Sequence, residues 1–65
     1  MKILVNGQPL DTDCATLAAL LEQLQYRPEQ VATAIDGIFI ARTTRAQTPL
    51  TAGMAIDIVV PIQGG

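Results

Sequence analysis

The sequence predicts a small α+β domain in which one helix packs against one face of a mixed sheet of about five strands. Three observations indicate this fold class: leucines at helical spacing, two short hairpin signals, and apolar strand-like segments near both ends of the chain. One amphipathic helix can cover one face of one small sheet, which gives a two-layer domain. With 65 residues, 49% of them apolar, the chain has material for one aliphatic core.

The first segment predicts a β-hairpin. Residues 2–5 form an apolar strand, and the Asn6-Gly7 pair that follows is the strongest short hairpin signal. The return strand, at residues 8–12, contains Pro9. Because proline has no backbone N–H to donate, this strand is expected at an edge of the sheet.

A single amphipathic helix is predicted next. Its apolar positions recur at i, i+3, i+4 and i+7, the spacing of one helix face: Leu17, Leu20, Leu21 and Leu24. Thr16 offers an N-cap side chain. We expect a helix of about three turns, which ends before Pro28 because the residue preceding a proline disfavours the α conformation.

The second half of the chain predicts three further strands, at residues 31–35, 38–41 and 54–60. The Asp36-Gly37 pair joins the first two of them in a second hairpin. Residues 42–51 show no periodicity, so we expect a loop with one helical turn.

The order of the elements predicts the topology. The first and last strands are the most continuously apolar, so both should be central and lie side by side. They must then be parallel, with the helix in the crossover between them. This is the β-grasp, or ubiquitin-like, arrangement. We expect residues 1–65 to form a single domain of this kind, with residues 61–65 as a flexible tail.

Composition excludes several classes of function. The net charge is −2 and the four basic residues are scattered, which argues against nucleic-acid binding. No apolar run approaches the ~20 residues of a membrane span, and the N-terminal segment lacks the pattern of a signal peptide. Cys14 is the only cysteine, so no internal disulfide is expected. These features predict a cytoplasmic protein.

The chain is poor in catalytic groups. It contains no histidine, so Cys14 has no imidazole partner to activate it, and a structural role in the turn before the helix is favoured. No glycine-rich phosphate loop is present, and the carboxylates fall mostly on turns and exposed faces. We therefore expect no catalytic residue, no metal site and no bound cofactor.

The sequence ends in Gly64-Gly65, and the terminal carboxylate is the reactive group that this ending offers. Two residues without side chains can enter a narrow channel. A carboxylate is a poor electrophile until ATP converts it to an acyl-adenylate, and nothing in this chain predicts ATP binding. ATP would therefore be used by a partner adenylyltransferase, and the chain would be a substrate of partner enzymes.

A chain whose terminal carboxylate is modified by partner enzymes also needs a surface on which those enzymes can dock. One face of the sheet should meet the helix leucines, and the other should stay apolar and exposed; we expect the second face to include Leu4, Phe39, Val59 and Ile62. Arg42 and Arg45 would flank it or lie solvated elsewhere on the surface. The alternative is that these apolar side chains lie beneath the loop of residues 42–51.

The order of these motifs resembles the ThiS family over the whole chain. The resemblance rests on Asn6-Gly7, the Thr16-Leu17…Leu20-Leu21…Leu24 helix, Ala34-Ile35-Asp36-Gly37 with Arg42, Gly53, and Gly64-Gly65. It implies a sulfur carrier of thiamin biosynthesis. A ThiF-like adenylyltransferase would activate Gly65, a cysteine persulfide would supply sulfur for a thiocarboxylate, and a ThiG-like thiazole synthase would accept it. Ala41 and Arg45 stand where members often have a proline and an aromatic residue, which bears on the partner surface.

Three alternatives stay open at this point. The chain could be a MoaD-like sulfur carrier for molybdopterin synthesis, although such carriers are usually longer. It could be a ubiquitin-like modifier that is joined through its terminal glycine to lysines of other proteins. It could also be a β-grasp interaction module whose tail has no function.

Overall fold

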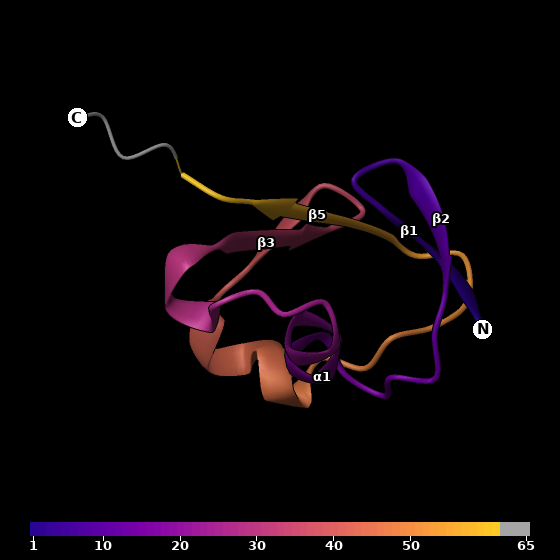
Figure 1. Ribbon diagram of the computed structural model, residues 1–65, viewed down its shortest axis with the longest axis horizontal. Helices are drawn as coiled ribbons and strands as arrows, with labels where there is room; N and C mark the ends of the chain where they lie inside the picture. The colour runs from indigo at the N-terminus through magenta and orange to yellow at the C-terminus, as the bar shows by residue number, and fades with distance from the viewer. Residues whose placement is uncertain (62–65) are drawn as a thin grey trace.

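A five-stranded mixed sheet with one α-helix against one face makes up the part of the chain that is described, residues 1–61 of a computed structural model (Figure 1). Two 3-10 helices, η1 and η2, complete this part. In chain order the elements are β1 (Lys2–Val5), β2 (Gln8–Asp11), α1 (Leu17–Gln23), η1 (Pro28–Gln30), β3 (Ala32–Ile35), β4 (Ile38–Ile40), η2 (Arg42–Gln47) and β5 (Ala55–Val59).

The strands follow the order β2-β1-β5-β3-β4 across the sheet. The pairing of β1 with β5 is parallel, and the pairings β1–β2, β3–β4 and β3–β5 are antiparallel. The predicted fold class and the predicted parallel pair are confirmed. The return strand with Pro9 is an edge strand, as the missing N–H requires. Strand limits differ from the predicted ones by one residue at most.

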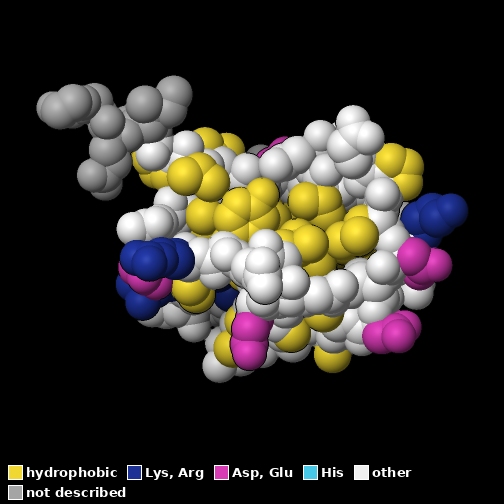
Figure 2. Space-filling view, in the orientation of Figure 1, with side chains coloured by type: hydrophobic (Ala, Val, Ile, Leu, Met, Phe, Trp, Pro, Cys, Tyr) yellow, Lys and Arg dark blue, Asp and Glu magenta, His cyan; other side chains and the backbone are white. Residues whose placement is uncertain are grey.

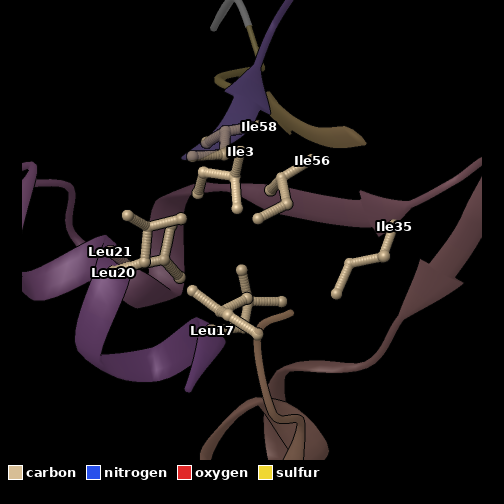
Figure 3. Close-up of a cluster of buried hydrophobic side chains, with 8 residues drawn as sticks. Ile3, Leu17, Leu20, Leu21, Ile35, Ile56 and Ile58 are labelled. Carbon is tan, nitrogen blue, oxygen red and sulfur yellow. The ribbon is translucent and has the colours of Figure 1, made fainter. Parts of the chain in front are cut away.

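The core lies between the helix and the sheet. Three leucines of α1 face isoleucines of the sheet (Figure 3). The buried apolar residues are Ile3, Leu17, Leu20, Leu21, Ile35, Leu50, Ile56 and Ile58. Leu17, Leu20 and Leu21 are buried as their helical spacing predicts, whereas Leu24 follows the helix and is half-buried. In β1 and β5, strand alternation buries Ile3, Ile56 and Ile58.

Helix α1 is shorter than predicted. It ends at Gln23, with Leu24 as its C-cap, well before Pro28. Gln25 takes a left-handed backbone conformation with φ of 64°. Its N–H bonds to the Glu22 carbonyl, and the Tyr26 N–H bonds back to the Leu21 carbonyl. This is the Schellman termination, in which the left-handed position usually holds glycine; the sequence has no glycine there to signal it.

The segment predicted as a loop is more ordered than expected. Six of its residues form η2, which packs beside α1. After η2, the Thr48 carbonyl accepts a hydrogen bond from the Leu17 N–H, and the Leu50 N–H donates to the Ala15 carbonyl. Leu50 thereby joins the core. The segment contacts the helix layer, so it leaves the opposite face of the sheet uncovered.

No helix in residues 1–61 is both long enough and apolar enough to cross a membrane.

Candidate functional site

The strand that leads to the predicted functional tail is the centre of the sheet. β5 lies between β1 and β3, and the chain leaves it through Val60 and Pro61, both exposed. Ile62, Gly64 and Gly65 lie outside the described residues, so the roles predicted for them stay predictions, as does the tail of residues 61–65.

Both hairpin turns contact β5 through a side chain. Asn6 and Asp36 occupy the same position in their turns, each with φ of 51° and each followed by glycine. The Asn6 side chain makes two hydrogen bonds with the main chain of Ile58, and an Asp36 carboxylate oxygen accepts one from the Ala55 N–H. The turns therefore hold β5 at both of its ends, in addition to shaping the hairpins.

Leu4, Phe39 and Val59 lie on the sheet face that points away from α1. Their exposed fractions are 39%, 68% and 58%. Strand alternation accounts for this, because the neighbours Ile3 and Ile58 are buried against the helix. Their common orientation is what a docking face requires; that partners bind there stays a prediction.

The strand register brings small residues between the large ones. Phe39 is opposite Ala34, which is opposite Asp57 on its other side, and Val59 is opposite Ala32. The face is therefore a shallow apolar surface with a carboxylate within it. The two alanines are not among the residues predicted for this face, although their position in β3, alternating with buried Thr33 and Ile35, would have placed them there.

A second apolar surface lies where the β1–β2 hairpin meets the end of α1. Figure 2 shows hydrophobic side chains gathered between the sheet and the helix layer. An open hollow is lined there by Val5, Leu10, Leu24 and Tyr26, among others. These side chains are half-buried and pack against the core, so this surface is the rim of the core.

Arg45 is not at the surface, where the sequence placed it. It is 3% exposed, and its guanidinium donates to the Thr33 hydroxyl at 3.0 Å and to the carbonyls of Pro28 and Val31 at 2.8 and 2.7 Å. Burial and the nearby charge of Arg42 lower the pKa of Arg45 from its usual value, but an arginine is a cation at any working pH. Arg45 therefore ties η2 to β3 and η1.

Arg42 begins η2 and is exposed, and no described contact sets it beside the apolar face.

Cys14 donates its thiol hydrogen to the Gln23 side-chain oxygen, and its N–H bonds to the Thr12 hydroxyl. It thus takes part in the turn that leads into the helix. Within residues 1–61, no group of acidic or cysteine side chains is arranged to hold a metal ion.

A comparison with models of protein families gives the family of this chain. The model of the ThiS family matches residues 3–65. The chain belongs to the ThiS family. The match continues through Gly64 and Gly65, so the two glycines of the predicted tail fall within the family's own pattern.

Two solved structures of thiamine biosynthesis proteins are similar to this chain. The crystal structure of the thiamine biosynthesis protein ThiS from Geobacter metallireducens is 28% identical, with a TM-score of 0.85 and full coverage of both chains. A solution structure of a thiamine biosynthesis protein from the same organism is 28% identical with a TM-score of 0.81, covering 100% of this chain and 88% of that one. The search of curated proteins found no match.

Proposed function

We propose that this ThiS-family chain carries sulfur for thiamin biosynthesis on the carboxylate of Gly65. The observation that supports it most is the family match over residues 3–65, which includes the terminal diglycine. The placement of the described strands adds to this, because the chain leaves the sheet from its central strand through exposed Val60 and Pro61.

The proposed reaction takes place in the active sites of partner enzymes. In a ThiF-like adenylyltransferase, a Gly65 carboxylate oxygen attacks the α-phosphorus of ATP and pyrophosphate leaves. The terminal sulfur of a cysteine persulfide then attacks the acyl carbon and AMP leaves. A second thiol reduces the resulting acyl disulfide, which releases the thiocarboxylate. A ThiG-like thiazole synthase takes this sulfur for the thiazole ring.

The chain's own part is to dock and to present its end. The exposed face around Leu4, Phe39 and Val59 offers apolar area that a partner can cover. Gly64 and Gly65 have no side chains, so they suit a narrow channel in the partner. Catalytic groups and ATP belong to the partner in this proposal.

Intact-mass spectrometry tests the proposal. The chain is incubated with ATP, a sulfide source and its cognate adenylyltransferase. The expected product is heavier by the mass difference between one sulfur and one oxygen atom. A wild-type chain of unchanged mass under these conditions would contradict the carrier function, and stable isopeptide adducts on other proteins would favour the ubiquitin-like modifier.

The matched control is the chain without Gly65. It should show no such mass increase, because the reactive carboxylate is displaced by one residue. Its melting temperature should equal that of the full chain, since the last strand in residues 1–61 ends at Val59. A marked loss of thermal stability would mean that the end of the chain supports the fold, which contradicts its role as a presented tail.

A further inference from the structure

Asn6 makes the last cross-strand link between β1 and β5 in the described residues. The register of this parallel pair ends at Val5 opposite Ile56, since the chain then turns at Asn6 and Gly7. The Asn6 N–H still bonds to the Ile56 carbonyl, at 2.8 Å. Beyond that point, only the side chain of Asn6 continues the ladder.

The Asn6 side chain replaces the missing main chain. Its Oδ1 accepts a hydrogen bond from the Ile58 N–H at 2.8 Å, and its Nδ2 donates one to the Ile58 carbonyl at 3.1 Å. If the parallel pair continued, the carbonyl of one residue next to β5 would accept from the Ile58 N–H. The N–H of the residue two positions later would donate to the Ile58 carbonyl. One carboxamide therefore does for β5 what two further residues of β1 would do.

This link lies on the segment of β5 that leads to the terminal glycines. Ile58 stands seven residues before Gly65 in the sequence. On its other side, the end of β5 is held by the pairing of Val59 with Ala32. Without the carboxamide, the end of β5 would be fixed from the β3 side alone, and the direction in which the chain leaves the sheet would be less defined.

We propose that Asn6 is a positioning residue for the carrier reaction: by fixing the end of β5, it directs the terminal glycines into the adenylating active site. This role rests on the proposed function. Among the described residues, the Asn6 side chain bonds to Ile58, and in this proposal it acts through Ile58 and the course of the chain after it.

The residue type supports this role over a plain turn role. Asparagine, aspartate and glycine all suit the left-handed position of such a turn. Asp36, at the equivalent position of the second hairpin, needs only an acceptor, for the Ala55 N–H at 3.0 Å. At Ile58 both an acceptor and a donor are needed. An aspartate there could accept from the N–H but would oppose the Ile58 carbonyl with a second oxygen.

The two turns supply a matched pair of variants. Asn6→Gly and Asp36→Gly both remove a side-chain link to β5, and glycine accepts the positive φ at both positions. They differ in the end of β5 that is released: Asp36 holds Ala55, its first residue, whereas Asn6 holds Ile58, next to its last. Asn6→Asp, which keeps only the acceptor, is a third variant.

ATP–pyrophosphate exchange by the cognate adenylyltransferase, at varied carrier concentration, measures the effect. Asn6→Gly should lower kcat about tenfold and leave the KM for the carrier unchanged, because the docking face is intact. Asn6→Asp should lower kcat in the same direction. Asp36→Gly should keep both constants at the wild-type value. Circular dichroism at the assay temperature shows that all chains are folded.

Amide hydrogen exchange tests the link itself. Exchange at Ile58 should become about tenfold faster in Asn6→Gly, and in Asp36→Gly the increase should fall at Ala55 instead. Unchanged exchange at Ile58 in Asn6→Gly would overturn the link. Faster exchange with kcat equal to that of Asp36→Gly would overturn the positioning role. A wild-type chain that supports no pyrophosphate exchange would overturn the proposed function, and with it this role for Asn6.

Discussion

Arg45 shows how a single residue can join three segments of a small fold. Its guanidinium is buried and bonded to two carbonyls and one hydroxyl, and within residues 1–61 no carboxylate forms an ion pair with it. The burial of Arg45 was not predicted, because charged residues are almost never fully buried without a charged partner. Its acceptors at Pro28 and Val31 exist only once η1 and the start of β3 are in place.

Replacing Arg45 with methionine is expected to lower the free energy of unfolding by about 2–3 kcal/mol. Methionine fills much of the same space but leaves the acceptors of Pro28, Val31 and Thr33 without their donor. Urea denaturation with linear extrapolation measures the loss. Arg42→Met is the control, since Arg42 is exposed and should change stability by less than about 0.5 kcal/mol. Equal losses in both variants would show that the buried hydrogen bonds contribute nothing.

The beginning of α1 could be predicted from sequence, whereas its end could not. Thr16 caps the helix as expected, through a hydrogen bond from the Ala19 N–H to its hydroxyl. The helix ends where Gln25 turns left-handed, and a glutamine carries no local signal for that conformation. The strands could be predicted more closely than the end of the helix. The two hairpin signals indicate turns with positive φ, and Pro9 has no N–H to donate, so each acts directly on the backbone. Where the local sequence pattern carries no signal, as at the end of α1, tertiary contacts determine the structure.

The left-handed Gln25 makes the helix end a place where stability can be gained. Gln25→Gly should raise the free energy of unfolding by about 0.5–1 kcal/mol, because glycine adopts a positive φ without the steric cost of a Cβ. Thermal and urea unfolding measure the gain. Glu22→Gly, in the helix and exposed, should instead lose about 1 kcal/mol. If Gln25→Gly destabilises as Glu22→Gly does, the side chain of Gln25 stabilises the turn by more than its backbone conformation costs.

At the scale of the whole molecule, the topology follows from a few features of the sequence. Two apolar strands near the chain ends and one helix between them require a parallel central pair, and the structure has it. The apolar face opposite the helix follows from strand alternation in the same way. The two alanines of β3 could have been placed on this face by the same alternation. The hydrogen bonds of Asn6 with β5 could not be predicted, because they join segments far apart in sequence.

The proposed docking face of Leu4, Phe39 and Val59 can be tested separately. Phe39→Ser should raise the KM of the carrier about tenfold in pyrophosphate exchange, as expected for losing an aromatic contact at an interface, and leave kcat unchanged. Its stability should stay close to wild type, because Phe39 is already 68% exposed. Glu22→Ser, exposed in the helix layer, is the control and should change neither constant. An unchanged KM for Phe39→Ser would remove this residue from the docking face.

The central position of β5 also decides when this protein can fold during its synthesis. β5 pairs with β1 on one side and β3 on the other, so residues 1–54 alone contain two hairpins with no strand between them. Contacts between segments far apart in sequence form only after both have been made. A ribosome must therefore release the chain as far as β5 before the sheet closes, and until then the leucines of α1 have only part of their apolar partner surface.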